Sequence, residues 1–344
     1  MLAMKRRIWL GAVVIPLLLV LCAGVSGCKS NRPAWMSWPE SPAEDFQYTV
    51  SEDGKEIWLS KYVGSSEAVV IPARINGLPV TKLNGVEDPD HGLVTEGVFQ
   101  DHTSVKEVVL PETLISVGMS AFSGCTSLTN VYIPENSPLE VIGSSAFWGC
   151  TALQGMDLSS TKVWIIADDA FRSCSALTEF HFPDTLTEIR ENAFFGCSSL
   201  LEARLPDSLI TIGDNAFAGC AALKRVTIPP KLELGSLYIP MFYGVPVLEQ
   251  IIFTEGREAL IGNNMIHITS EVEIIIPKSV TRFSGYLFVT DGKIPVCLKF
   301  LGDCPSIEHY EQGDYNNFTV YYDPATQGWE NAVWADVFEL KPME

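Results

Sequence analysis

Apolar and polar positions along this chain repeat with a period of 23 to 25 residues. Five copies have an Ala-Phe pair, a cysteine three residues after the phenylalanine, and a leucine followed by alternating apolar positions, which end at proline in four of them; weaker copies at Val98-Phe99 and Met241-Phe242 flank these five. One such unit cannot bury its apolar side alone, so a period of this length predicts a solenoid of stacked copies. The repeated phenylalanines are Phe99, Phe122, Phe147, Phe171, Phe194, Phe217 and Phe242.

The second half of each repeat predicts a short β-strand. In one copy Leu128 is followed by Val131 and Ile133, which alternate as in a half-buried strand, and Pro134 ends it. Stacked copies place these strands side by side, about 4.8 Å apart. The predicted fold is therefore a solenoid with one short parallel strand per repeat and little helix. The phenylalanines are expected to form an internal column, each contributing roughly 2 to 3 kcal/mol through burial.

A glycine recurs four residues before the repeated phenylalanine, at Gly118, Gly143 and Gly213. This recurrence predicts a turn with a positive φ angle. Ala167 and Arg190 occupy the same position in other repeats, so the requirement is not strict.

Residues that flank the central apolar position of each strand are expected to point outward. They vary in charge and size from repeat to repeat, whereas the inward positions hardly change. Such variation fits ligand-contacting positions, and it also fits ordinary exposure to solvent. The candidate ligand-binding residues on these outward positions are Tyr132, Asp157, His181, Arg204 and Arg225.

The repeated pattern L-x-x-I-G-x-x-A-F-x-x-C-x-x-L-x-x-V-x-I-P resembles the BspA-type leucine-rich repeat of bacterial surface proteins. Five copies match well, and the region of resemblance covers about 94 to 300. The resemblance implies a leucine-rich-repeat fold and protein or matrix partners on host or neighbouring cells. It does not name a ligand, because the same fold carries many binding roles.

The segments on either side of the repeats are expected to be β-rich caps, since a solenoid with exposed ends would aggregate. Residues 48–93 contain strand-like segments around Tyr48, Trp58 and Val69, separated by Gly54 and Gly64. Residues 75–81 resemble the module that precedes repeats of this family. Residues 301–344 are expected to form the C-terminal cap, in which 321–329 resembles the terminal module of the family.

The first 27 residues have the layout of a secretory signal, with three basic residues at 5–7 followed by an apolar run. Small residues directly before Cys28 resemble the bacterial lipobox, which implies that Cys28 is lipidated and becomes the mature N-terminus. The alternative is an uncleaved membrane anchor. Residues 28–47 contain several prolines and no apolar periodicity, which predicts a flexible tether. Lys29 after the cysteine implies an outer-membrane or cell-surface location rather than a periplasmic one.

Charge narrows the choice of partners. Without the first 27 residues the chain has 20 basic and 42 acidic residues, a net charge of −22. Nucleic acid and anionic lipid head groups need basic patches, so neither is an expected partner.

Five cysteines, at 125, 150, 174, 197 and 220, occupy the same position of the repeat, which predicts inward-facing free thiols. A column of parallel thiols does not converge on a metal, so no metal is expected there. Cys297 and Cys304 are seven residues apart, and whether they form a disulfide is left open. The acidic segment 87–91 is interpreted as a solvated loop, with a calcium loop as the alternative.

The chain has no phosphate-binding glycine loop, no H-E-x-x-H and no G-x-S-x-G. No cofactor is expected, and the chain is predicted not to be an enzyme. The favoured function is a cell-envelope lipoprotein that presents the repeats for protein binding or adhesion. One alternative is a glycan-binding accessory lipoprotein, with stacking rings from Trp148, Trp164 and Tyr132. An envelope hydrolase with an unrecognised site is the other alternative.

Overall fold

The computed structural model describes residues 37–84, 86–87, 94–233, 242–260, 266–284, 288–290, 294–308, 317–331, 333–336 and 338–344. The chain divides into two compact units, Met1–Ser37 and Trp38–Glu344, and all that follows concerns the second. The predicted signal, the lipidation site at Cys28 and the predicted tether up to residue 36 lie outside the described residues. So does the predicted acidic loop from residue 88 to 91.

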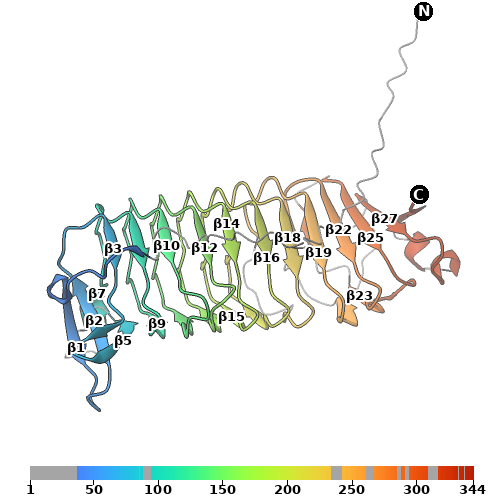
Figure 1. The fold of residues 1–344 in the computed structure, drawn as a ribbon. Coiled ribbons are helices and arrows are strands. Elements are labelled where there is room, and N and C mark those ends of the chain that lie inside the picture. The colour runs from blue at the N-terminus through green and yellow to red at the C-terminus, as the bar shows by residue number, and fades with distance from the viewer. Residues whose placement is uncertain are drawn as a thin grey trace, which may run out of the picture. The chain divides into compact units, whose positions relative to one another are not determined.

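Short parallel strands follow one another along this unit in three groups of three, two and seven strands, and together these groups are called the long sheet here (Figure 1). Its strands pair in register, with Val131 opposite Val108 and Ile251 opposite Val226. Backbone bonds from Gln154 N–H to Thr129 C=O and from Leu201 N–H to Thr178 C=O, both 3.3 Å, join the segments of the ladder. The parallel strand predicted in the second half of each repeat is confirmed. The strands are β3 (Ala68–Val70), β8 (Glu107–Val109), β10 (Asn130–Tyr132), β12 (Gly155–Asp157), β14 (Glu179–His181), β16 (Glu202–Arg204), β18 (Arg225–Ile228), β19 (Gln250–Phe253), β22 (Val272–Ile276), β25 (Val296–Phe300), β27 (Phe318–Tyr322) and β28 (Glu339–Pro342).

The other half of each repeat forms a second sheet that the sequence pattern did not predict. Its repeat strands have only two residues each and are again parallel, with Ile142 opposite Val117 and Ile166. Such short strands give no measurable alternation in sequence. The strands, with the N-terminal ones that join them, are β1 (Phe46–Val50), β2 (Ile57–Tyr62), β4 (Arg74–Ile75), β5 (Leu78–Leu83), β9 (Ser116–Val117), β11 (Val141–Ile142), β13 (Ile165–Ile166), β15 (Glu188–Ile189) and β17 (Thr211–Ile212).

Three small sheets and three short 3-10 helices complete the described elements. Strands β20 (Ala259–Leu260), β23 (Arg282–Ser284) and β26 (Ser306–Glu308) form one parallel sheet. The other two sheets are the parallel pair β21 (Ile266–Ile268) and β24 (Phe288–Thr290) and the antiparallel pair β6 (Val86–Glu87) and β7 (Val94–Glu96). The 3-10 helices are η2 (Ala43–Asp45), η4 (Trp329–Asn331) and η5 (Val333–Asp336). Helix is therefore as scarce in the described residues as the pattern predicted.

The repeated phenylalanines form the predicted internal column. All seven rings are fully buried, and each of the first six stacks on the ring of the next repeat. Ring centroids are 5.0 Å apart for Phe147 and Phe171 and 5.3 Å apart for Phe171 and Phe194, with interplanar angles of 4° and 8°. Phe180 of β14 packs edge-on against the rings of Phe171 and Phe194 at 5.0 and 4.9 Å. The column is continuous, so every repeat buries the faces of its neighbours.

The five repeated cysteines point inward as free thiols, as predicted. Each thiol donates a hydrogen bond to the carbonyl of a phenylalanine in the preceding repeat, as in Cys150 to Phe122 at 3.0 Å and Cys174 to Phe147 at 3.1 Å. Burial raises the pKa of Cys125 and of Cys220 to about 12. The thiolate is the reactive form, so these side chains act as inert packing groups at neutral pH.

The prediction of positive φ angles at Gly118, Gly143 and Gly213 is wrong. These glycines are needed for a close approach between repeats instead. A Cβ at Gly118 would lie 2.2 Å from the carbonyl oxygen of Leu83, and one at Gly213 would lie 2.4 Å from the amide nitrogen of Glu191. Positive φ values occur at other positions of the repeat, on short polar residues and on the glycine before the cysteine: Ser120, Ser145, Asp169, Asn192, Asn215, Gly124, Gly149, Gly196 and Gly219.

The N-terminal end contains the strands predicted there. β1 and β2 pair antiparallel in the second sheet. β2 then pairs in parallel with β5, and β5 pairs in parallel with β9 of the first repeats. The hairpin between β4 and β5 turns through Asn76 and Gly77, with φ values of 52° and 82°. Asn-Gly is the preferred pair for such a turn, because both residues tolerate positive φ.

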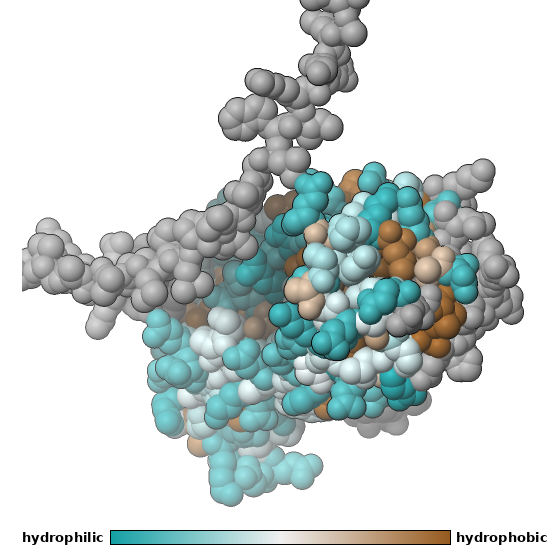
Figure 2. Space-filling view, turned by 90° about the vertical axis from the view of Figure 1, so that its right-hand side faces the viewer, coloured by the Kyte–Doolittle hydropathy of each residue, from teal (hydrophilic) through white to brown (hydrophobic). Residues whose placement is uncertain are grey.

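At the C-terminal end, β27 and β28 extend the long sheet by two further parallel strands. Phe318, Trp329 and Phe338 are buried beneath them. The last strand holds Glu339, Lys341 and Pro342, and charges and proline discourage pairing with another chain. Figure 2 looks onto this end of the stack, where hydrophilic residues surround a smaller apolar area.

Candidate binding face

The outward side of the long sheet is the candidate functional site. The structure places all five candidate ligand-binding residues on it, in register: Asp157 lies opposite His181, and Arg204 opposite Thr227. Two columns of outward side chains extend along the sheet. The first contains Glu107, Asn130, Gly155, Glu179, Glu202, Arg225, Gln250 and Glu273, and the second contains Val109, Tyr132, Asp157, His181, Arg204, Thr227, Ile252 and Ile275, of which Val109 is buried.

Tyr132 is already engaged within the protein. Its hydroxyl donates a hydrogen bond to Glu107 at 2.9 Å, and its ring meets Trp38 edge-on at 5.9 Å. Partial burial raises the pKa of Tyr132, and the hydrogen bond to the Glu107 carboxylate raises it further. The segment that carries Trp38 is held in place by the amide of Ser41, which bonds to the carbonyl of Val70 at 2.8 Å. A ligand on this part of the face would therefore meet Trp38 together with Tyr132.

Asp157 has a structural role in the turn after β12. Its carboxylate accepts hydrogen bonds from the backbone N–H of Ser159 at 2.9 Å and from the Ser159 hydroxyl at 2.6 Å. A carboxylate that bonds to the amide two residues on is the usual way in which aspartate stabilises a turn. One oxygen carries both bonds, and the side chain remains exposed on the face.

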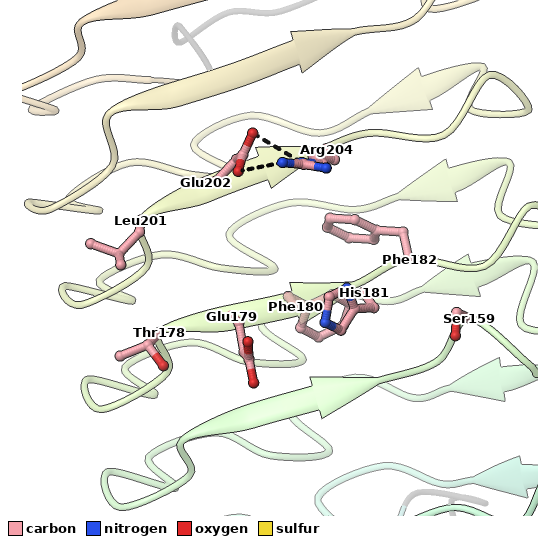
Figure 3. A pocket seen from close by; sticks show the side chains of 9 residues that line it. All are labelled: Ser159, Thr178, Glu179, Phe180, His181, Phe182, Leu201, Glu202 and Arg204. Carbon is pink, nitrogen blue, oxygen red and sulfur yellow. Dashed lines mark hydrogen bonds and ion pairs between the residues drawn. The ribbon is translucent and has the colours of Figure 1, made fainter. Parts of the chain in front are cut away.

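His181 and Arg204 border a shallow groove of about 500 Å³ between β14 and β16 (Figure 3). Arg204 pairs with both oxygens of Glu202, at 3.0 Å through Nε and 3.1 Å through a terminal nitrogen. Among the described residues, no side chain hydrogen-bonds to the imidazole of His181, which is exposed. Apolar contact area comes from Phe182 and from Leu201, which is 51% exposed. The groove thus combines a fixed cation, an imidazole and apolar surface.

A chain of polar contacts continues from this groove towards the C-terminal end. Arg225 lies 3.8 Å from Glu202 and donates a 3.0 Å hydrogen bond to Gln250, which in turn donates to Glu273 at 2.6 Å. Lys299 of β25 then pairs with Glu273. Partial burial opposes ionisation of Glu273, but the hydrogen bonds from Lys299 and Gln250 lower its pKa. Each contact joins side chains on neighbouring strands of the long sheet.

The structure does not bring together the three aromatic rings proposed for glycan stacking, nor the cysteine pair considered for a disulfide. Trp164 precedes β13 in the second sheet, Trp148 lies in the turn after Ala146-Phe147, and Tyr132 lies on the long sheet, so the three rings occupy three parts of the repeat. Cys297 lies on β25 and Cys304 lies in the segment after it, and both are free thiols in this structure.

Sequence reasoning missed three contributors to the face: Trp38, Phe182 and Leu201. Trp38 could not be placed from sequence, because Tyr132, the residue it contacts, lies more than three repeat lengths further along the chain. Leu201 has a visible signal, since it stands where other repeats have the polar residues Lys106, Thr129, Gln154, Thr178 and Lys224. An exposed leucine at a position that is otherwise polar is a departure from the repeat pattern.

Parallel strands stacked every 23 to 25 residues over an interior of leucine and phenylalanine define a leucine-rich-repeat solenoid. The family model described as BspA type leucine-rich repeat region matches residues 93–181 and 164–294 with six copies. The chain belongs to this family.

Several solved structures are similar to this chain. A leucine-rich repeat protein of T. pallidum is 28% identical over 62% of this chain and 86% of its own, with a TM-score of 0.41. A leucine-rich cell surface protein of Faecalibacterium prausnitzii is 20% identical over 90% of this chain and 95% of its own, with a TM-score of 0.43. A leucine-rich repeat protein of Bacteroides ovatus is 17% identical over 89% of this chain and 100% of its own, with a TM-score of 0.39. No curated protein matches the chain significantly.

In the described part of the chain, no helix has both the length and the apolarity to span a bilayer. Within the same residues, no three His, Cys, Asp or Glu side chains gather in a way that could hold a metal ion.

Proposed function

We propose that this protein is a non-enzymatic lipoprotein of the cell envelope that binds a protein partner through the outward face of the long sheet. One observation carries the proposal: inward positions repeat almost unchanged, whereas the outward columns present varied charged, aromatic and apolar side chains in fixed register. The partner is a protein of the host, of the surrounding matrix or of a neighbouring cell.

The shape of the face supports a macromolecular partner. The groove beside His181 is open and shallow, whereas sites for small molecules enclose most of their ligand. Arginine and aromatic residues with a polar surround are typical of the energetic centre of protein interfaces. Arg204, Phe182 and Leu201 provide such a centre, and the contact chain from Arg225 to Lys299 provides the polar surround.

The arrangement of polar groups also supports a non-enzymatic role. Glu202 and Glu273 are each neutralised by a basic partner, so neither is poised as a general base. The buried thiols of the cysteine column are protonated and shielded from solvent. These groups stabilise the solenoid and its face.

The proposed organisation begins with a signal at 1–27, a lipid on Cys28 and a tether over 28–47 that together display the face at the cell surface. The displayed domain then consists of the N-terminal cap at 48–93, the repeats at 94–300 and the C-terminal cap at 301–344. An outer-membrane or cell-surface location would leave the outward columns accessible to partners.

Replacing Cys28 by alanine is expected to abolish incorporation of labelled palmitate and to release the protein from the membrane fraction. Cys22→Ala is the matched control, because this cysteine lies within the predicted signal and should leave labelling unchanged. Protease added to intact cells is expected to digest the wild-type domain. Persistent labelling of the Cys28 variant, or complete protection from protease, would contradict the proposed anchoring or location.

Replacing Arg204 by alanine is expected to weaken partner binding by about tenfold or more, as truncation of an interface arginine commonly does. Binding would be measured with the full chain and its partner captured from matrix or host-cell surface proteins. Arg190→Ala is the matched control, because Arg190 pairs with Glu188 as Arg204 pairs with Glu202, but beside β15 of the second sheet. Equal losses in the two variants, or none in either, would place the contact away from the long sheet.

A further inference from the structure

The N-terminal end of the second outward column is apolar and shielded from solvent. Val70, Val109 and Tyr132 lie in register there, on β3, β8 and β10. Val109 is only 6% exposed, although it points outward and is not part of the interior cluster of apolar side chains. Asp157 and His181, further along the same column, are exposed. A group outside the sheet therefore covers this end of the column.

The segment just before η2 makes contacts at both ends of this apolar stretch. At β3, Ser41 N–H donates to the carbonyl of Val70 at 2.8 Å, and the Ser41 hydroxyl accepts the Val70 N–H at 3.2 Å. At β10, the ring of Trp38 meets that of Tyr132 edge-on, with the centroids 5.9 Å apart. Three extended residues span about 10 Å, which is close to two strand spacings. The segment that joins the two contacts therefore passes over β8, where Val109 lies.

Residues 38–41, called the strap here, are attached at the surface of the solenoid. In addition to the contacts of Trp38 and Ser41, the Glu40 carboxylate accepts the N–H of Ala73 at 3.1 Å. None of the four strap residues is buried. Detaching the strap would thus uncover the apolar stretch without opening the interior of the solenoid.

The strap shows which ligand chemistry the apolar stretch accepts. An indole ring lies against Tyr132, a carboxylate two residues later meets a backbone N–H, and the next residue pairs with the edge of β3. Pro39 and Pro42 restrict the strap to extended conformations, so it loses little conformational entropy when it lies on the face. A partner segment with the same features would reach the Tyr132 ring only by replacing Trp38.

We propose that Val70, Val109 and Tyr132 form a subsite of the long-sheet face for an extended, proline-containing protein segment that has a tryptophan followed two residues later by an acidic residue. The strap occupies this subsite in the free protein, and the partner segment binds by displacing it. The assignment of this segment to the protein partner rests on the proposed function, whereas the subsite itself can be tested without any partner.

A synthetic peptide with the sequence of residues 37–42, in which 5-fluorotryptophan replaces the tryptophan, tests the subsite by fluorine NMR. The full-length double variant Trp38→Ala, Ser41→Pro loses the ring contact and both bonds to Val70. In the wild-type chain the strap competes at the millimolar effective concentration of a short linker, so the peptide is expected to bind the wild type at least tenfold more weakly than the double variant. Adding Tyr132→Ala to the double variant is expected to weaken peptide binding by about tenfold.

Trp35→Ala is the matched control, because Trp35 precedes the strap in sequence, and this variant should bind the peptide as weakly as the wild type. Far-UV circular dichroism is expected to be unchanged in every variant, since no strap residue is buried. Equal peptide binding by the wild type and the double variant, or none by the double variant at millimolar concentration, would overturn the proposal. So would peptide binding by Trp35→Ala that is as tight as that of the double variant.

Analytical ultracentrifugation distinguishes a second possible role of the strap. Dimerisation of the double variant would show that the strap only covers the edge of β3 against another copy, and it would overturn the subsite. The result is also separable from the test of the proposed function. Unchanged partner binding in Arg204→Ala together with the expected peptide binding would contradict the proposed function but not the subsite.

Discussion

Replacing Phe194 by alanine is expected to lower the free energy of unfolding by about 4 kcal/mol. The ring is fully buried and stacks between Phe171 at 5.3 Å and Phe217 at 5.0 Å. Phe180 packs edge-on against it at 4.9 Å. In a solenoid each repeat is stabilised mainly by its two neighbours, so a cavity at this point weakens two interfaces at once. Urea unfolding followed by far-UV circular dichroism would measure the change.

The adjacent Phe195 provides a control within the same repeat. Its ring lies outside the column, beneath the Arg172 guanidinium at 4.8 Å, so Phe195→Ala is expected to cost only about 1 kcal/mol. Similar losses of stability for the two variants would contradict the assignment of Phe194 to the core and Phe195 to the surface.

Replacing Gly97 by alanine is expected to destabilise the protein by about 3 kcal/mol, which is near the upper end of the usual cost of overpacking. A Cβ at Gly97 would lie 1.8 Å from the carbonyl oxygen of Ser120 in the next repeat. Backbone atoms cannot move aside as a flexible side chain does. The backbone bond from Phe99 N–H to Ala121 C=O, at 2.7 Å, would have to lengthen to make room. Thermal and urea unfolding would both register the effect.

Gly155→Ala is the corresponding control on β12. A Cβ there would lie 3.2 Å from Cγ of Glu179, an exposed and flexible side chain, and Gly155 has no positive φ angle. The stability is expected to change by less than about 1 kcal/mol. If Gly97→Ala proved equally mild, the first repeats would be packed less closely than the structure shows.

The period of the repeats determined much of the fold in advance. A phenylalanine and a cysteine that recur every 23 to 25 residues must occupy equivalent positions in every repeat. For apolar side chains, equivalent positions shielded from solvent exist only in the interior of the stack. The phenylalanine column, the buried thiols and the outward register of Tyr132, Asp157, His181, Arg204 and Arg225 followed from that argument.

The role of the recurrent glycines did not follow from it. Sequence shows that Gly118, Gly143 and Gly213 share a position, but positive φ and close backbone approach both favour glycine. Only the stacked structure shows that the carbonyl of Leu83 occupies the space beside Gly118. The left-handed residues are instead Ser120, Asp169 and their equivalents, whose side chains give a weaker sequence signal.

The grouping of exposed aromatic residues also needed the structure. Trp148 and Trp164 are only 16 residues apart in sequence, yet they lie in different parts of the repeat, whereas Trp148 and Tyr243 are 95 residues apart and each directly follows a phenylalanine of the column. Likewise the contact of Trp38 with Tyr132 depends on how the segment before β1 meets the long sheet.

The sequence by itself determined that this chain forms a leucine-rich-repeat solenoid and which side chains fill its interior, because burial imposes the same demand on every repeat. Only the tertiary structure decided which exposed side chains lie together, because residues on different rungs become neighbours through the stacking of the rungs. The groove beside Arg204 is therefore a property of the stack, and no single repeat encodes it.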